Sequence, residues 1–413
     1  MRSFLLRFGL FHSIAIAALF VGCGDGGSAS GGGDDGGGGD DGSGGNATTS
    51  TGGPGGGGSG GSGGAPPCTA NTLAEAVRTT SIPIAGGASG RAITAQAGAG
   101  SVVAWAGQDG KIHVTPLDAV DQRSGDDILV DGSQVFGVAA GAGDVALLVS
   151  RPPDFMTFVR VDMTGTELVK VDLVGGGDHA TIGVEWFGEF AQTGRLAVHK
   201  DGTYAAYHAL HRRWPDNIGH QGDTLRMLDA SGNAVGGWGL GCSHSLDQRI
   251  ASGPNGLVPI CISDCYPGKG IYFNHQSSEI TPDPNADCAG GYSTKLGGLV
   301  ATDTGFFLVY QDAQGGAHLG AFDTSGKATS DRALAVEGSS RLARYGSGML
   351  LGSSGGGGTS LQQLDASGQD VGAPAMVTTP LPDQDFEGRS DGEVAWASVS
   401  GANLSVVRVQ TCP

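Results

Sequence analysis

The residues best suited to chemistry in this 413-residue sequence lie between positions 208 and 293. Imidazole and carboxylate groups in this segment could bind polar ligands or move protons, and aromatic rings could stack on a sugar or a peptide. We therefore predict a ligand-binding site in this segment. Its predicted residues are Trp214, His220, Asp223, His244, Asp247, Arg249, Asp264 and Tyr266.

Two functions of different classes fit these side chains. The first is a binding or scaffolding module for a protein or glycan. The second is an exported polysaccharide hydrolase or lyase, whose catalysis would depend on His244, Asp247, Arg249 and Asp264. The sequence contains no Ser-His-Asp ordering, phosphate-binding loop or nucleophile-elbow motif. We therefore expect binding rather than catalysis, with no cofactor and no metal.

A recurring turn indicates how the elements around this segment are built. The pentapeptide Leu-Asp-Ala-Ser-Gly occurs at 228–232 and again at 364–368, and looser copies occur at 117–119, 161–165 and 322–326. The Asp side chain can bond backbone groups two residues on, and Gly adopts a positive φ without strain. Short apolar runs flank each copy, so each turn is predicted to close a β-hairpin.

The spacing of the turns predicts a β-propeller. Asp118 and Asp162 are 44 residues apart, and Asp323 and Asp365 are 42 apart. A period in the forties with several strands per unit is typical of propeller blades. We predict an all-β fold, a propeller of seven blades, with six or eight blades as alternatives. The simpler interpretation is an unrelated all-β protein with similar turns.

The seven units divide the chain between positions 91 and 410. Unit five is the plainest, with strands at Leu299–Thr302, Phe306–Gln311, Ala317–Phe322 and Ala328–Leu334. The last unit ends after its third strand. The run Ser81–Ala85 is predicted to supply the missing outer strand, because ring closure removes open sheet edges. The other units cover 91–133, 135–175, 186–240, 243–287, 340–378 and 386–410.

In a propeller, the loops between second and third strands share one face with the links between blades. Four long connections of units three and four should therefore lie side by side, at 211–223, 241–249, 263–270 and 281–293. Structural roles compete with ligand binding here. Asp247 and Arg249 share one side of a strand and could form only an ion pair near the channel. His220 and Asp223 could simply hold a long loop by hydrogen bonds.

The N-terminal residues are typical of export. Arg2 and Arg7 precede an apolar run at 8–21, which is too short to span a bilayer comfortably. The run ends in Leu19-Phe20-Val21-Gly22-Cys23, which resembles the lipobox of bacterial lipoproteins, although Phe20 stands where that family prefers Leu. The resemblance implies that Cys23 carries lipid such as palmitate. A plain secretory signal with an incidental cysteine is the alternative.

Residues 24–67 consist almost entirely of Gly, Ser, Asp and Thr, a composition that cannot form a core. We therefore expect a signal peptide at 1–22, a lipidated cysteine and disordered linker at 23–67, and a propeller domain at 68–413. The domain should lie outside the cytoplasm in a bacterial cell envelope, held at the outer membrane or cell surface by the lipid. The segment 208–293 also resembles stretches in exported proteins of myxobacteria and their relatives.

The net charge of −18 disfavours nucleic acid as a partner. The membrane, through the N-terminal lipid, and a protein or glycan ligand are the expected partners of a monomer.

Besides Cys23 there are six cysteines, and an even number in an exported chain predicts disulfides. Cys68 and Cys412 lie at the two ends of the ring and are predicted to pair. The remaining four lie in or beside unit four and allow three pairings. A zinc site that uses Cys261, Cys265 and His244 is the alternative. Those four cysteines are Cys242, Cys261, Cys265 and Cys288.

Overall fold

The structure is a computed structural model. It describes residues 72–411 apart from positions 142, 152–154, 174–191, 214–218, 245–246, 267, 276, 285–292, 337–339 and 356.

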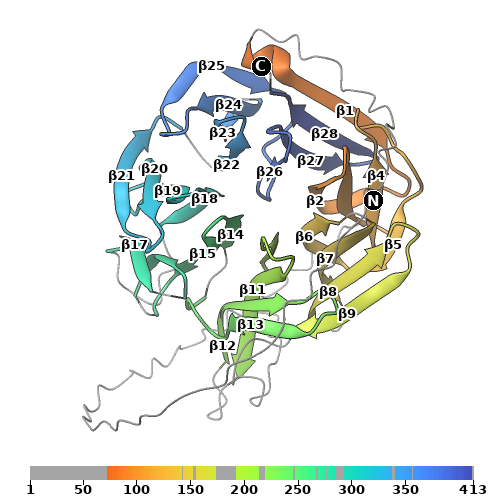
Figure 1. The fold of residues 1–413 in the computed structure, drawn as a ribbon, viewed down its shortest axis with the longest axis horizontal. Helices are drawn as coiled ribbons and strands as arrows, with labels where there is room; N and C mark the ends of the chain where they lie inside the picture. Colours follow the sequence, from red (N-terminus) through yellow and green to blue (C-terminus); the bar gives the residue numbers. More distant parts are fainter. Residues whose placement is uncertain are drawn as a thin grey trace, which may run out of the picture. The chain divides into compact units, whose positions relative to one another are not determined.

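Seven antiparallel sheets of four strands form the blades of a β-propeller (Figure 1). Blade one contains β2 (Ala88–Ala97), β3 (Gly100–Gly107), β4 (Lys111–Leu117) and β5 (Ile128–Asp131). Blade two contains β6 (Gln134–Ala140), β7 (Asp144–Arg151), β8 (Phe155–Asp162) and β9 (Glu167–Leu173). Blade three contains β10 (Gly194–Val198), β11 (Tyr204–Arg213), β12 (Gly219–Leu228) and β13 (Ala234–Trp238). The prediction of seven blades, rather than six or eight, is thus confirmed.

The remaining blades repeat this order. Blade four contains β14 (Gln248–Gly253), β15 (Gly256–Ser263), β16 (Gly270–Phe273) and β17 (Ser278–Pro282). Blade five contains β18 (Lys295–Ala301), β19 (Gly305–Gln311), β20 (Ala317–Asp323) and β21 (Ala328–Leu334), close to the predicted strands. Blade six contains β22 (Ser340–Tyr345), β23 (Gly348–Gly355), β24 (Gly358–Leu364) and β25 (Asp370–Val377). Blade seven contains β26 (Glu387–Gly388), β27 (Val394–Ser400) and β28 (Asn403–Val409).

The N-terminal strand completes blade seven. Strand β1 (Val77–Pro83) pairs antiparallel with β28, from Val77 opposite Val409 to Pro83 opposite Asn403. The short helix α1 (Leu73–Ala76), which has a capping box at Thr72, leads into this strand. The predicted closure by the N-terminal strand is confirmed, although β1 begins four residues before the predicted Ser81 and ends two before Ala85.

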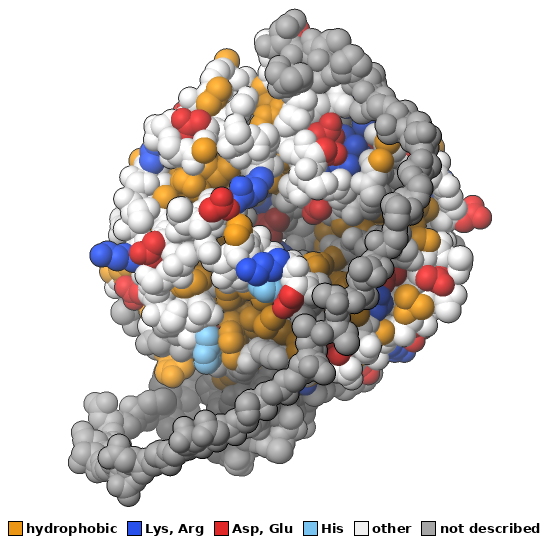
Figure 2. Space-filling view, viewed as in Figure 1, with side chains coloured by type: hydrophobic (Ala, Val, Ile, Leu, Met, Phe, Trp, Pro, Cys, Tyr) orange, Lys and Arg blue, Asp and Glu red, His pale blue; other side chains and the backbone are white. Residues whose placement is uncertain are grey.

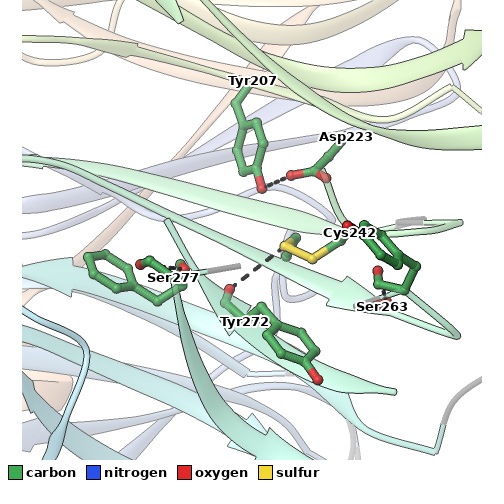
Figure 3. The surroundings of a disulfide bond; sticks show 9 residues. Tyr207, Asp223, Cys242, Ser263, Tyr272 and Ser277 are labelled. Carbon is green, nitrogen blue, oxygen red and sulfur yellow. Dashed lines mark hydrogen bonds between the residues drawn. A yellow bond between two sulfur atoms is a disulfide. The ribbon is translucent and has the colours of Figure 1, made fainter. Parts of the chain in front are cut away.

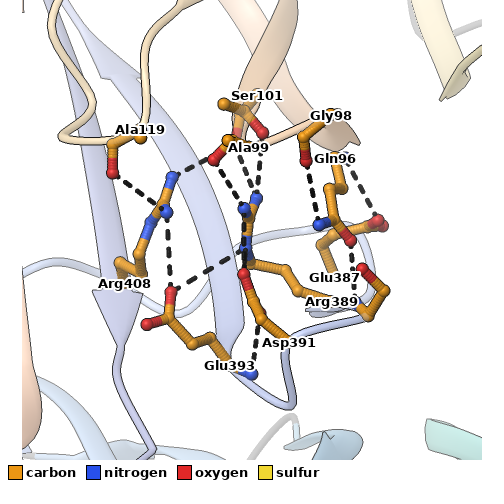
Figure 4. Close-up of polar contacts among 12 residues, drawn as sticks. Gln96, Gly98, Ala99, Ser101, Ala119, Glu387, Arg389, Asp391, Glu393 and Arg408 are labelled. Atoms are coloured by element: carbon orange, nitrogen blue, oxygen red, sulfur yellow. Dashed lines mark hydrogen bonds and ion pairs between the residues drawn. The ribbon is translucent and has the colours of Figure 1, made fainter. Parts of the chain in front are cut away.

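Buried charges reinforce the junction between blades seven and one (Figure 4). Arg389 donates to the Ser101 hydroxyl at 2.9 Å, and Arg408 pairs with the fully buried Asp121. Arg78 of β1 reaches the same Asp121 carboxylate at 2.6 Å. One carboxylate therefore connects the closing strand, blade seven and blade one.

The repeated turns have the predicted hairpin structure. Asp229 Oδ1 accepts hydrogen bonds from the N–H groups of Ser231 at 2.8 Å and Asn233 at 2.9 Å, and Gly232 has a φ of 82°. Asp365 forms the same contacts with Ser367 and Gln369. Each turn joins the third strand of a blade to its outer strand, so it lies on the face opposite the loops between second and third strands. We call the latter face the top face.

Apolar packing between blades forms the core. Trp105, Phe136 and Phe158, on the first three strands of their blades, are fully buried, whereas the outer strands carry many exposed positions. Phe273 of blade four lies 5.1 Å, centroid to centroid, from Phe306 of blade five. Each blade thus buries its apolar side against its neighbours, which keeps the inner strands in fixed positions around the centre. Within the described part of the chain, no helix has the length and apolar composition needed to cross a membrane.

Candidate binding site on the top face

Four arginines project from the innermost strands near the start of each strand on the top face. Arg195, Arg249 and Arg341 are each the second residue of β10, β14 and β22. Each donates Nη1 to the carbonyl of the preceding residue, at 2.8, 2.9 and 2.7 Å respectively. Arg91 lies near the start of β2 in blade one. The propeller repeat therefore places the same cation on several blades at one level.

Two carboxylates lie among these arginines. Asp247 pairs with Arg249, as the structural interpretation of the sequence predicted, and lies 3.6 Å from Arg195 Nη2. Asp385, from the segment before β26, lies 3.0 Å from Nε of both Arg195 and Arg249. Burial alone would raise the pKa of Asp385, but Arg249, Arg195 and Arg341 lower it below its usual value. Asp385 is therefore ionised and connects blade seven to blades three and four.

A cavity of about 340 Å³ opens among these side chains. Its lining includes the four arginines, Lys295 of blade five and the carboxylates of Asp247 and Asp383. We call this site the channel mouth. Figure 2 shows acidic and basic side chains close to one another around the centre of the face in view.

The loops of blade four bring His244 and Asp264 together. Both residues are close in sequence to residues that line the cavity, such as Asp247 and Ile262. His244 Nδ1 lies 2.8 Å from Asp264 Oδ2, and this hydrogen bond raises the pKa of His244. Ser243 N–H donates to the Tyr266 carbonyl at 3.0 Å, and Asp264 N–H donates to the Ser243 carbonyl at 3.2 Å. The link before blade four is therefore tied to the loop between β15 and β16, where the Tyr266 side chain is 64% exposed.

A disulfide connects the link before blade four to strand β15 (Figure 3). Cys242 in the link pairs with Cys261 of β15, one of the pairings that the sequence left open. Because Cys261 is bonded to Cys242, it does not offer zinc a thiolate, even though Asp223 places an oxygen within 4.8 Å of both sulfurs. Cys265 is also disulfide-bonded. Cys68, Cys288 and Cys412 lie outside the described residues, so the Cys68–Cys412 pair stays a prediction.

Asp223 is not at the surface. It is fully buried and accepts a hydrogen bond from the Tyr207 hydroxyl, and burial raises the pKa of its carboxyl to about 7. Asp223 lies within β12 and bonds to β11, so it holds two strands together rather than a loop, and the predicted connection at 211–223 is wrong because β11 extends to Arg213 and β12 begins at Gly219. The side chain of His220 lies outside the described part, as does Trp214, whereas the backbone of His220 pairs with Arg212 in blade three.

The structure places His244, Asp247, Arg249, Asp264 and Tyr266 in the blade-four loops and inner strand. Sequence reasoning missed the other members of the channel mouth. Comparing the repeats with one another could have found the arginines, because three inner strands share the pattern Arg, Leu or Ile, Ala. The missed residues are Arg91, Arg195, Lys295, Arg341, Asp383 and Asp385.

Comparisons with known proteins find only distant structural likenesses. No protein-family model and no curated protein matches this sequence. The WD40 propeller domain of Doa1 is 14% identical over 81% of this chain and 98% of its own, with a TM-score of 0.44. The WD40 domain of Neurospora crassa Pan2 is 10% identical over 76% and 86%, with a TM-score of 0.45. A gluconolactonase from Xanthomonas campestris is 14% identical over 81% and 90%, with a TM-score of 0.40. At these identities and scores the likeness carries no information on activity, and the chain has the architecture of a seven-bladed β-propeller.

Proposed function

We propose that this protein is an exported, lipid-anchored binding module that holds a protein or glycan against the top face of blades three and four. The lipobox-like sequence at Cys23 and the Gly-rich linker support the anchoring. The linker would then hold the propeller away from the membrane surface. This proposal places the ligand on the blade-four loops rather than on the short Asp-Gly turns of the opposite face.

The observation that carries the proposal is that covalent and hydrogen bonds connect two loops of blade four, the link before β14 and the loop between β15 and β16. The Cys242–Cys261 disulfide, the His244–Asp264 contact and the hydrogen bonds between Ser243 and Tyr266 fix these loops before any ligand binds. A rigid loop pair loses little conformational entropy on binding. Tyr266 adds an exposed aromatic ring, a side chain that supplies contact area with few rotatable bonds.

One observation favours the alternative of a polysaccharide hydrolase or lyase. His244 and Asp264 lie within hydrogen-bond distance, as a histidine base and the carboxylate that orients it would. However, neither residue is among those that line the channel-mouth cavity, and a catalytic pair needs a pocket that brings substrate to it. Binding therefore accounts for the described geometry better than catalysis does.

The test is a glycan and peptide array probed with the purified full-length protein. Tyr266→Ala should weaken capture of any ligand found by about tenfold, because the variant loses an exposed aromatic contact. Met376→Ala on the outer strand of blade six is the matched control, since Met376 is 61% exposed and Tyr266 64%. Equal capture by both variants and the parent would place the site elsewhere.

The two functions can be separated on any polysaccharide that binds. An enzyme should release reducing ends or unsaturated products, and His244→Gln should abolish that release while binding persists. A binding module should release nothing from the polysaccharide, with or without this substitution.

A further inference from the structure

The channel mouth carries more positive charge than its own carboxylates neutralise. Among the described residues it holds five basic side chains, namely the four arginines and Lys295, against Asp247, Asp383 and Asp385. The formal excess is two positive charges, in a chain whose overall net charge is −18. Such a local reversal of sign draws anions toward the centre of the ring.

Once Arg195 and Arg249 are matched with two carboxylates, Arg91, Arg341 and Lys295 remain against Asp383, which leaves the excess of two. Arg195 and Arg249 share the carboxylates of Asp247 and Asp385. Arg341 instead directs its donors to main-chain carbonyls, those of Gln384 at 2.7 Å and Asp383 at 2.9 Å, as well as Ser340. Within the described part of the chain, Arg341 forms no ion pair.

Arg91 has even fewer partners. Its Nη1 is buried and has no hydrogen-bond partner among the residues that the structure describes, and its guanidinium lies 5.2 Å from the centre of the Phe136 ring. Burial lowers the pKa of Arg91, although the nearby carboxylates of Asp383 and Asp247 oppose the shift. A buried donor on a charged group is costly to leave unpaired, and an anion in the cavity would relieve that cost.

The chemistry of the cavity narrows the class of anion. The planar guanidinium presents parallel N–H donors that match a carboxylate. The exposed Asp383 in the same cavity would repel a doubly charged anion but can accept hydrogen bonds from hydroxyl groups. Thr193 and Gln311 add further polar groups to the lining. A singly charged ligand that carries several hydroxyl groups suits this set, and about 340 Å³ lies within the range of small-molecule sites.

We propose that the channel mouth binds a small polyhydroxylated carboxylate, that is, a sugar acid, with the carboxylate held between Arg91 and Arg341. This site is distinct from the blade-four loops, so it stands whether or not those loops bind a protein or glycan. The inner strands of several blades build it, and only ring closure brings them together.

The direct test is titration calorimetry of the purified full-length protein with glucuronate, glucose and inorganic phosphate at low ionic strength. Glucuronate should bind at least about tenfold more tightly than glucose, because only the carboxylate can form charge-assisted bonds to the arginines. It should also bind more tightly than phosphate, and its affinity should fall as NaCl is added. Equal binding of glucuronate and glucose, equal binding of phosphate, or no binding of glucuronate at millimolar concentration would each overturn the proposal.

Three variants test whether glucuronate binds at the channel mouth. Arg91→Gln should weaken glucuronate binding about tenfold without lowering the thermal midpoint, since the lost group had an unpaired donor. Asp383→Asn should strengthen binding severalfold, because it removes a repelling charge from an exposed side chain. Arg332→Gln is the matched control and should bind glucuronate as the parent does. Arg332 lies on the outer strand of blade five and pairs with Asp370 on the outer strand of blade six. Unchanged affinity in both channel-mouth variants would refute the assignment, even if Arg91→Gln proved unstable.

Discussion

At the scale of single residues, burial of Asp223 makes stability depend on pH. Burial raises the pKa of this carboxyl from 3.8 to about 7, although the hydrogen bond from Tyr207 opposes the shift. The folded state therefore holds the proton more tightly than the unfolded state. Its contribution to stability is complete below about pH 4 and is lost as the pH rises toward 7, a change on the order of 4 kcal/mol.

We predict that Asp223→Asn becomes more stable relative to the parent as the pH rises from 4.5 to 7.5. The amide stays neutral and still accepts the Tyr207 hydrogen bond. The measurement is the free energy of unfolding of both proteins in urea at each pH. Other buried groups also titrate, such as His208, whose pKa burial lowers to about 4, and Glu387, whose pKa burial raises to about 7. These groups are present in both proteins and cancel in the difference, so a constant difference across this range would contradict the prediction.

Asp365 illustrates a residue whose role is local. Its Oδ1 accepts hydrogen bonds from Gln369 N–H, Ser367 N–H and the Ser367 hydroxyl, and these bonds lower the pKa of the carboxyl. Asp365→Asn should leave the thermal midpoint unchanged, because the amide oxygen can accept the same bonds. Asp365→Ala should lower the midpoint by about one to two degrees. If differential scanning calorimetry finds that the two variants unfold at the same temperature, the side-chain bonds do not stabilise this turn.

At the scale of elements, the sequence predicted what local rules govern. The Asp-Gly turns follow from side-chain bonding and from glycine's positive φ, so their positions fixed the hairpins and the repeat. One turn departs from this rule. Asp121 takes the glycine position of the first copy with a φ of 61°, and its buried contacts to Arg78 and Arg408 explain the exception. Such long-range contacts have no local signal in the sequence.

The channel mouth was missed for the same reason. Asp385 pairs with Arg195, which is 190 residues away in the sequence, and no local sequence pattern predicts this ion pair. By contrast, the incomplete last unit predicted that an N-terminal strand must close the ring, and β1 does so. The fold was thus predictable from repeated local chemistry, whereas the charged centre depends on how the blades meet.

Ring closure also bears on the predicted disulfide between Cys68 and Cys412. The chain ends of the described part lie together, since Val77 pairs with Val409 and Gln410 N–H donates to the Ala76 carbonyl at 3.0 Å. A bridge here would restrict the unfolded chain over almost the whole domain, which the loop-entropy model values at on the order of 5 kcal/mol, an upper figure. Cys412→Ser should therefore lower the thermal midpoint markedly.

Peptide mapping under non-reducing conditions checks the pairing directly. A fragment that joins the peptides of Cys68 and Cys412 is expected. Finding either residue as a free thiol, or joined to a blade-four cysteine, would remove this prediction and leave β1 held by its strand pairing and by the contact of Arg78 with Asp121.

At the scale of the whole molecule, charge is unevenly distributed. The chain is strongly acidic, yet the centre of its top face concentrates arginines from four blades. A propeller permits this arrangement because each blade contributes only one or two side chains to the centre while its outer strands stay solvated. The same arrangement lets loops of one blade change without disturbing the others, which suits a module that displays binding loops.

The position of that module in the cell depends on Cys23. If the lipobox-like sequence is processed as the resemblance implies, the Cys23 thiol carries lipid, and the Gly-rich linker holds the propeller away from the bilayer.

Cys23→Ser removes the only group that can be lipidated at this site. The variant should therefore move from the membrane fraction to the soluble fraction of cells that export the protein. Ser28→Ala in the neighbouring linker is the matched control, since it also removes one small polar group near Cys23, and it should remain with the membranes. Labelling with a radioactive fatty acid should mark the parent and this control but not Cys23→Ser. Retention of Cys23→Ser in the membrane fraction would show that something other than a lipid on this cysteine holds the propeller there.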